Sequence, residues 1–378
     1  MAAHATLNAS SADRWLHCPP SVRLTEGLPD ASSSFAEEGT LAHAIAESAL
    51  HYYKDNGKLD GYKVPTAMRK HPFFYESMLD DVMPYIEYVV DTLEAKDKAA
   101  FLEIESRLDF SEWVPEGFGT GDAVIACNDT LEIIDLKFGK GKVVDAEENP
   151  QIMLYGLGAL AANAYIYDIE KVRMTIVQPR LDHITTYTLS ADALTDWANT
   201  VVRPLAQLAF AGQGVTSAGK WCQWCKIRST CRVRAEALMQ VADKRQKAVL
   251  TDSELSEVLS KASEIKAWLD GVEEAVTQRL MDGEAISGWK LVEGRSNRKI
   301  KDAEALEVVL TKDYAPQEVL KPQELLPLTA LEKLIGKKKF MENYGDFIYK
   351  PKGKPTLVPE SDKRPALGSP EADFNFED

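Results

Sequence analysis

The sequence predicts an α/β protein with a mixed central sheet, and two observations support this prediction. Apolar residues recur at helical spacing, then in three short strand-like runs, and then in a helix followed by two more strand-like runs. The chain of 378 residues is 45% hydrophobic and 27% charged, a balance typical of folded globular proteins and not of disordered ones. At roughly 150 residues per domain, this length predicts about two or three domains.

The first half of the chain contains the elements of that sheet. Helical spacing covers residues 39–54 and 75–98, and Pro84 is expected to interrupt or kink the second helix. Strand-like runs follow over residues 102–109, 119–127, 131–137, 172–178 and 184–189. Asn128-Asp129-Thr130 is a hairpin turn between the second and third runs. Pro150, a residue favoured in the first helical turn, begins a helix over residues 150–163.

The second half is predicted to be mostly helical. Helical spacing covers residues 191–211 and 252–281, and shorter helical segments lie near 302–311 and 327–336. Prolines recur after residue 351, which is typical of a flexible tail. We therefore divide the chain into a core, a helical connector, a small C-terminal α/β module and a tail, with the boundaries 1–240, 241–285, 286–350 and 351–378.

Charge and composition exclude several classes of protein. Acidic residues number 59 and basic residues 44, a formal charge of −15, which disfavours coating nucleic acid by bulk charge but allows a local basic groove. No GxxxxGK[ST] phosphate loop occurs, so ATP hydrolysis through a P-loop is not expected. The chain has no apolar run of about 18 residues, and its first residues do not resemble a signal peptide. We therefore expect a cytoplasmic protein without a membrane partner.

The densest chemical signal lies between residues 119 and 155. Asp122 lies in one predicted strand, and Asp135 and Lys137 lie on its hairpin neighbour. Because side chains alternate along a strand, Asp135 and Lys137 share one face, which the hairpin can also bring to Asp122. Carboxylates can hold Mg²⁺ or Mn²⁺ for phosphodiester hydrolysis, and a lysine ammonium can orient water and stabilise negative charge. His43, on the first predicted helix, offers a nitrogen that favours Mn²⁺.

Taken alone, these residues also allow simpler interpretations. An Asp-x-Lys sequence is common on solvated sheet edges, and Asp122 after glycine can be a turn residue. His43 lies near an apolar helix face, where a histidine is often a satisfied core residue. Gln151 and Tyr155, one helical turn apart, can simply cap and pack.

Four segments in order nevertheless resemble the motifs of the RecB-like branch of PD-(D/E)XK nucleases. They are Glu38-Gly39-Thr40-Leu41-Ala42-His43, Gly121-Asp122, Asp135-Leu136-Lys137 and Gln151-Ile152-Met153-Leu154-Tyr155. The resemblance implies a restriction-endonuclease-like core whose metal ligands are His43, Asp122 and Asp135. It also implies that Lys137 is the catalytic lysine and that Gln151 and Tyr155 lie near the scissile DNA. Some branches carry Glu at the position of Asp135, and the family tolerates Asp there.

Four of the five cysteines form a second candidate site. Cys222, Cys225 and Cys231 lie within ten residues, and Cys18 lies far upstream. Four thiolates can hold Zn²⁺ or an iron–sulfur cluster, and spacing alone does not choose between them. Cys127 lies in an apolar run and is expected to be a small buried hydrophobic residue.

The cysteine pattern resembles a known arrangement. Ser11-Ala12-Asp13-Arg14-Trp15-Leu16-His17-Cys18-Pro19 is similar to the opening of the iron–sulfur nucleases related to AddB and to CRISPR-associated RecB-like exonucleases. There, one cysteine precedes the nuclease motifs and a C-x2-C-x5-C segment follows them. The resemblance implies a [4Fe–4S] cluster held by Cys18, Cys222, Cys225 and Cys231 that staples the two ends of the core together. Trp221 and Trp224 are expected to shield it, although packing alone explains them equally well.

Basic residues gather in three places of this acidic chain. Lys137, Lys140 and Lys142 follow the catalytic strand, and two further runs are Arg295–Lys301 and Lys337–Lys339. Each run is also compatible with an ordinary solvated face. Together they predict contact with DNA phosphates, and no motif that reads a base sequence accompanies them, so low sequence specificity is expected.

The resemblance covers about residues 10–235 and implies a metal-dependent DNA exonuclease in recombination or DNA end processing. Compact members of this kind occur among phages and mobile elements, which implies action in the bacterial host cytoplasm, with a single-strand annealing or single-strand-binding protein as a candidate partner. Two alternatives stay open: a catalytically idle DNA-end-binding protein with a structural metal–cysteine site, and a zinc-stabilised interaction protein. Metal-dependent cleavage separates the first alternative from the nuclease, and the iron-to-zinc ratio separates the second.

Overall fold

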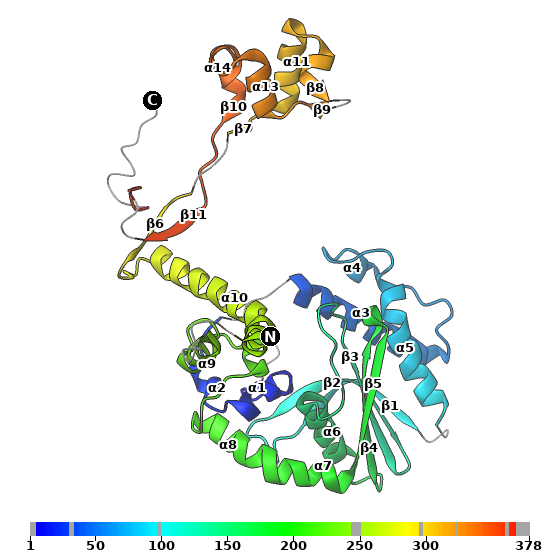
Figure 1. The fold of residues 1–378 in the computed structure, drawn as a ribbon. Coiled ribbons are helices and arrows are strands. Elements are labelled where there is room, and N and C mark those ends of the chain that lie inside the picture. The colour runs from blue at the N-terminus through cyan, green and yellow to red at the C-terminus, as the bar shows by residue number, and fades with distance from the viewer. Residues whose placement is uncertain are drawn as a thin grey trace. The chain divides into compact units, whose positions relative to one another are not determined.

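Five strands form one mixed sheet in the computed structural model (Figure 1). The structure describes residues 5–29, 34–96, 100–242, 251–294, 298–321, 324–359 and 363–367. The sheet has the order β1 (Phe101–Asp109), β2 (Phe118–Cys127), β3 (Thr130–Leu136), β4 (Lys171–Gln178) and β5 (His183–Ser190). Strands β3 and β4 run parallel and the other neighbours run antiparallel, which confirms the predicted α/β class and mixed sheet.

The strands arise where the sequence predicts them. Asn128, at the hairpin between β2 and β3, has φ 51°, a left-handed conformation that asparagine tolerates better than most residues. The parallel pairing of β3 with β4 requires a crossover, which α6 (Pro150–Asn163) provides. This helix begins as expected, because Pro150 occupies its first turn and the Asn149 side chain accepts the Gln151 N–H.

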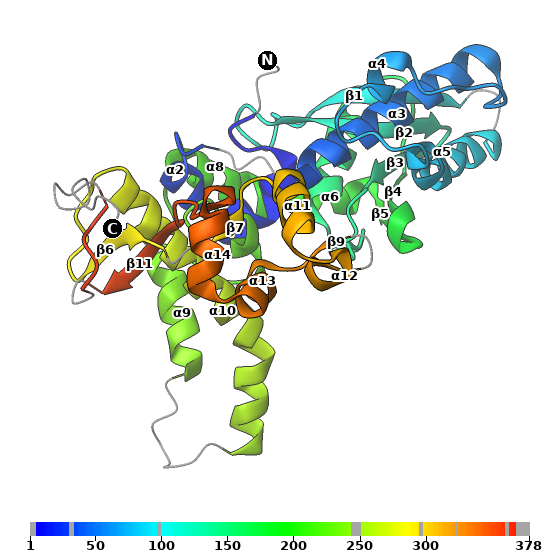
Figure 2. The same cartoon turned by 90° about the horizontal axis from the view of Figure 1, so that it is seen from above.

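Helices cover both faces of the sheet, and alternate residues of β2 and β3 pack into different cores. Helices α3 (Ser34–Asn56) and α5 (Met78–Glu94) pack against each other on one face, as Figures 1 and 2 show, together with Ile125 and Ile134. Helix α6 packs on the other face with Val124 and Ile133. Helix α5 runs through Pro84 as a single element, so the predicted interruption does not occur.

The N-terminal and C-terminal ends of the larger unit come together. Helices α1 (Ala12–His17) and α2 (Ser21–Leu24) contact α8 (Arg203–Ala211), and α1 contacts the short 3-10 turn Lys220–Trp224. The predicted helix over 191–211 consists of α7 (Ala191–Trp197), a π-helical turn (Ala198–Val202) and α8. Pro204 in the first turn of α8 lacks an N–H, which accounts for the wider turn before it. The remaining helices of this part are α4 (Thr66–Arg69) and α9 (Arg232–Ala242).

The described residues divide into two compact units, within Met1–Val258 and Leu259–Asp378. Helix α10 (Asp252–Met281) contains this boundary. None of the helices among the described residues is both long and apolar enough to cross a membrane.

The second unit has a small core of its own, which includes Leu306, Leu331 and Phe340. Its helices are α11 (Ala303–Asp313), α12 (Pro316–Val319), α13 (Leu328–Ile335) and α14 (Lys337–Tyr344). Its strands form three pairs, which are β6 (Trp289–Glu293) with β11 (Pro355–Pro359), β7 (Lys299–Ile300) with β10 (Ile348–Tyr349) and β8 (Leu320–Lys321) with β9 (Glu324–Leu325). Strand β11 lies inside the range 351–378 that was expected to be a flexible tail, so regular structure extends to Pro359.

Candidate metal site and cysteine cluster

The candidate site lies where the sheet opens between β2 and β3. The pairing of these strands ends at Ala123 and Ile134, although β2 begins at Phe118 and β3 continues to Leu136. At the opening, Oδ2 of Asp122 accepts the backbone N–H of Leu136 at 2.7 Å. The carboxylate of Asp122 therefore takes the place of a strand carbonyl. This hydrogen bond fixes Asp122 at the point where β2 and β3 separate, which we call the fork.

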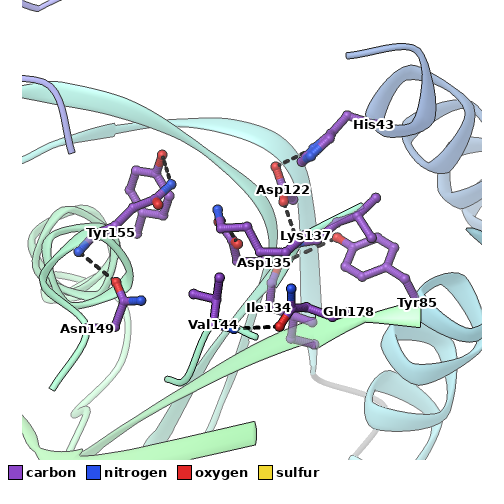
Figure 3. A network of polar contacts seen from close by, with 12 residues as sticks. His43, Tyr85, Asp122, Ile134, Asp135, Lys137, Val144, Asn149, Tyr155 and Gln178 are labelled. Atoms are coloured by element: carbon purple, nitrogen blue, oxygen red, sulfur yellow. Dashed lines mark hydrogen bonds and ion pairs between the residues drawn. The ribbon is translucent and has the colours of Figure 1, made fainter. Parts of the chain in front are cut away.

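His43 reaches this fork from α3. Its Nδ1 lies 3.1 Å from Oδ1 of Asp122, so the two carboxylate oxygens of Asp122 contact a helix and a strand at once. Figure 3 shows His43 and Asp122 on one side of the site and Tyr155 of α6 on the other. The structure thus places the predicted His43 beside the predicted Asp122, although 79 positions separate them in the chain.

Asp135 and Lys137 lie between those two sides (Figure 3). Lys137 Nζ is 2.7 Å from Oδ2 of Asp135, whose side chain is almost fully buried. That contact is an ion pair without the geometry of a hydrogen bond, so Oδ2 has no hydrogen-bond partner among the described residues. The shared face predicted for these two side chains is confirmed.

A fifth acidic or basic side chain at the site, Glu105 of β1, was not predicted. His43, Glu105 and Asp122 each offer one atom, and these three atoms lie within 4.8 Å of one another. No other set of three His, Cys, Asp or Glu side chains meets that distance in the part of the chain that the structure describes. The most compact set of metal-binding atoms therefore includes Glu105 and leaves Asp135 beside it.

The backbone explains how Glu105 enters the site. Its φ of 49° is a left-handed conformation that costs free energy for any residue other than glycine. Leu102 and Ile104 pack in the α3–α5 core, whereas Leu108 packs in the α6 core, although a regular strand would place all three on one face. Glu105 therefore interrupts the alternation of β1, and the sequence carries no signal of this, because Leu102, Ile104 and Leu108 keep the even spacing of a regular strand.

The electrostatics of the site favour protonated forms while no cation is present. Burial, with the nearby charge of Asp122, raises the pKa of Glu105 from 4.5 to about 7. Burial alone lowers the pKa of His43, but the carboxylates of Asp122 and Asp135 outweigh it and raise that pKa above 6.5. Negative charge is thus concentrated at the fork, as expected of a site for a cation.

Lys137 and Asp135 form an ion pair whose members shift each other's pKa. Burial lowers the pKa of Lys137, but Asp135 and Asp122 together raise it above its ordinary value, so the side chain is an ammonium at neutral pH. Burial raises the pKa of Asp135, and the ammonium of Lys137 acts against that rise. Lys137 is therefore a donor and a positive charge, and not a base.

The structure also brings Gln151 and Tyr155 to this end of the sheet. Gln151 Nε2 donates to the Tyr155 hydroxyl at 3.2 Å, and burial raises the pKa of Tyr155 to about 12. The Tyr155 ring lies so close to Gly119 that a Cβ there would be 2.6 Å from it. This ring therefore packs closely on β2, and its hydroxyl stays protonated.

The four predicted cysteines lie where the two ends of the larger unit meet. Cys18 follows α1, Cys222 and Cys225 lie in and after the turn Lys220–Trp224, and Cys231 precedes α9. Burial raises the pKa of Cys222 and of Cys225, and the charge of neighbouring cysteines raises each pKa further. No cysteine among the described residues is in a disulfide, and Cys127 is buried in β2, as predicted.

The two tryptophans beside the cysteines behave differently. Trp221 stacks on His17, with ring centroids 4.2 Å apart. Trp224 is 78% exposed, so its expected role in shielding the cysteines is wrong for this residue. It lies instead on the wall of a groove.

That groove, of about 1510 Å³, runs past the N-terminus of α6. Gln151, Lys142 and Trp224 are among its lining residues. Gln178 of β4 is buried and holds the loop at its edge, because its side chain accepts the Val144 N–H at 2.7 Å and donates to the Lys142 carbonyl at 3.0 Å. The predicted basic loop is thus fixed beside an open groove.

The other basic runs lie in the second unit. Lys337, Lys338 and Lys339 begin α14 and are exposed, with Lys338 Nζ 3.9 Å from Glu342. Residues 295–297 of the predicted run Arg295–Lys301 lie outside the described residues.

Comparison with known proteins identifies a family. The family model described as "Protein of unknown function (DUF2800)" matches residues 4–365. A solved structure described as "Crystal structure of SSO0001" is 15% identical, and the alignment covers 59% of this chain and 96% of the other, with a TM-score of 0.24. Residue roles therefore have to be argued from the geometry of this chain.

Proposed function

The chain belongs to the family described as protein of unknown function (DUF2800), and from its own site we propose that it is a metal-dependent DNA nuclease. The proposal places it in the RecB-like branch of the PD-(D/E)XK nucleases, acting as an exonuclease in recombination or DNA end processing. One observation carries it. Five side chains from α3 and from three strands meet where the sheet opens: His43, Glu105, Asp122, Asp135 and Lys137.

The donor set at the fork fits a divalent cation. His43, Glu105 and Asp122 supply one nitrogen and two carboxylates, a set that suits Mg²⁺ or Mn²⁺, with the nitrogen favouring Mn²⁺. Asp135, whose Oδ2 contacts the Lys137 ammonium at 2.7 Å, lies beside this set and is a further carboxylate that a cation could use. When bound, the cation would polarise a phosphodiester and lower the pKa of an attacking water.

Lys137 supplies the complementary charge. Its ammonium, held by Asp135 at 2.7 Å, can donate to the attacking water or to a phosphate oxygen on which negative charge develops. It does not remove a proton, because its pKa is raised above the ordinary value. Tyr155, protonated and joined to Gln151, is a second donor from α6 that can hold the DNA backbone.

The groove supports a polymeric substrate. Lys142 can contact phosphates, and an exposed aromatic ring such as Trp224 offers a surface on which a base can stack. The groove also carries acidic residues, among them Asp145 and Glu148, which repel phosphates. We therefore expect few phosphate contacts in the groove. We also expect binding to have low sequence specificity.

We assign the cysteines to a [4Fe–4S] cluster in a structural role. Cys18, Cys222, Cys225 and Cys231 fit such a group by their chemistry, since all four are free thiols gathered at one junction.

The nuclease proposal is tested with anaerobically purified protein, Mn²⁺ or Mg²⁺, and linear DNA labelled separately at each end. We expect the wild type to degrade the DNA and Asp135→Asn and Lys137→Met to leave it intact. Glu87→Gln removes an exposed carboxylate of α5 and is the matched control that should remain active. If every protein binds DNA and none cleaves it, the idle DNA-end-binding protein replaces the nuclease.

The cysteine assignment has its own test. Cys225→Ala is expected to lose visible absorbance, iron and acid-labile sulfide, and to unfold at a lower temperature. Cys127→Ala removes a thiol of β2 and should keep all three. A colourless wild type that binds one zinc per chain would favour the zinc-stabilised alternative.

A further inference from the structure

A buried arginine lies close to the cysteine ligands, and no acidic side chain among the described residues pairs with it. Arg234 of α9 is 7% exposed, and its Nη1 donates to the carbonyl of Arg228 at 2.8 Å. Its Nε is buried and has no hydrogen-bond partner among the described residues. None of the ion pairs found in the described part of the chain joins a carboxylate to Arg234.

Such a guanidinium is costly in the fold unless an anion accompanies it. A buried charge loses its hydration, and hydrogen bonds to neutral carbonyls repay only part of that loss. The side chain is always a cation at physiological pH, so it cannot escape the cost by losing a proton. The site must therefore supply negative charge when the protein is in its functional form.

The cysteines are the groups that can supply it. The charge of Arg234 acts to lower the pKa of Cys222, and the charge of Arg14 acts in the same way on Cys225, although burial outweighs both. Arg14, on α1, donates to Ser21 Oγ at 2.9 Å and also has no carboxylate partner among the ion pairs described. Two guanidiniums from the two ends of the core thus lie near two thiols.

The charges match for either metal. Four thiolates around a dication leave a net charge of about −2, whether the dication is Zn²⁺ or an oxidised [4Fe–4S] core. Two arginines offset that charge. In the structure, Arg234 donates to the neutral Arg228 carbonyl, and Arg14 donates to the hydroxyls of Ser21 and Thr25.

Arg234 also braces the loop between two of the ligands. The Arg228 N–H donates to the Cys225 carbonyl at 3.0 Å, and Arg234 in turn donates to the Arg228 carbonyl. The Ala235 N–H, in the next residue, donates to the Cys231 carbonyl at 3.0 Å. One side chain therefore connects the start of α9 to the loop that follows Cys225.

We propose that Arg234, together with Arg14, is the counter-ion of a dianionic metal group held by the four cysteines, and that it is a positioning residue for that group. The inference rests on the proposed cysteine site and is independent of nuclease activity. It predicts that Arg234 stabilises the loaded protein and does not stabilise the metal-free protein.

The test compares Arg234→Met and Arg234→Lys with Arg232→Met, which removes an exposed arginine of the same helix. Iron, sulfide and zinc are measured per chain, with the rate of metal loss to a chelator and the unfolding temperature of loaded and metal-free protein. We expect Arg234→Met to lose the group about tenfold faster or more, which is typical of residues that support metal ligands. Arg234→Lys should restore part of the loss, and Arg232→Met should behave as the wild type.

The metal-free protein separates a counter-ion from a merely structural residue. We expect Arg234→Met to lower the unfolding temperature of the loaded protein and to leave that of the metal-free protein unchanged or higher. Equal destabilisation of both forms, or unchanged metal retention in Arg234→Met, overturns the inference and leaves the cysteine site standing. A wild type that takes up neither iron nor zinc overturns both, and measured iron, sulfide or zinc identifies the group when one is present.

Discussion

Glu105→Gln is expected to stabilise the protein when no divalent cation is bound, and only at high pH. The substitution keeps the size of the side chain and removes its ability to ionise. In the structure, Glu105 lies partly buried beside Asp122, where its negative charge is unfavourable until a cation neutralises the site. Glu105, which helps to bind the cation, therefore destabilises the folded protein when no cation is bound.

The magnitude follows from the pKa. Its rise from 4.5 to about 7 means that the folded protein holds a proton that the unfolded chain has already released. Stability therefore falls as pH rises from about 4.5 to 7, and the full loss remains above that window. At 1.36 kcal/mol per pKa unit the loss is about 3 kcal/mol, and we halve it to about 1.5 kcal/mol because solvent reaches part of the side chain.

Denaturant unfolding in EDTA at pH 4.5 and pH 8.5 measures this effect. We expect wild type and Glu105→Gln to have similar free energies of unfolding at pH 4.5, and the variant to be more stable by about 1.5 kcal/mol at pH 8.5. With Mn²⁺ present, the order should reverse, because the variant lacks a charged ligand. A difference between the proteins that does not change with pH would refute the electrostatic argument.

Three further predictions concern the site and the fold. Lys137→Met should bind Mn²⁺ but reduce cleavage by about 10²–10³-fold, measured by single-turnover kinetics, whereas weakened Mn²⁺ binding with normal cleavage at saturation would contradict its role. Cation affinity, measured by calorimetry, should rise with pH through neutrality, because His43 must be neutral and Glu105 ionised to bind and the pKa of each is raised; a flat profile would contradict the assignment of these two residues as ligands. Gly158→Ala places a Cβ 2.9 Å from that of Leu108 and should cost about 1–3 kcal/mol of stability, measured by thermal unfolding, while Gly39→Ala, with open space around it, should be neutral or stabilising.

Local patterns predicted most of the secondary structure. The helix after Pro150 begins where expected because its cap, Asn149, and its proline are neighbours in the chain. The hairpin between β2 and β3 was likewise predictable from alternation and a short turn, and Ala123 does pair with Ile134. The parallel pairing of β3 with β4 depends on packing across α6, which no local pattern encodes.

The site was predictable in part. His43, Asp122, Asp135 and Lys137 lie together as the motifs implied, and Tyr155 of α6 lies across from them and accepts a hydrogen bond from Gln151 (Figure 3). Glu105 was missed because its position depends on a left-handed backbone conformation inside a strand, which the residue type gives no reason to expect. Trp224 was misplaced because the sequence shows that it neighbours two cysteines but not that its ring points to solvent.

The hydrogen bond from Leu136 to Asp122 has a further consequence, for the exchange of amide protons with solvent. This amide is protected by a side chain whose carboxylate can be protonated, substituted or drawn toward a cation, whereas its neighbours in β3 are protected by other strands. Its exchange rate is therefore set by the state of Asp122 and not by global unfolding. The exchange rate of this one amide proton in the centre of the sheet thus reports whether Asp122 is ionised, bound to a cation or substituted.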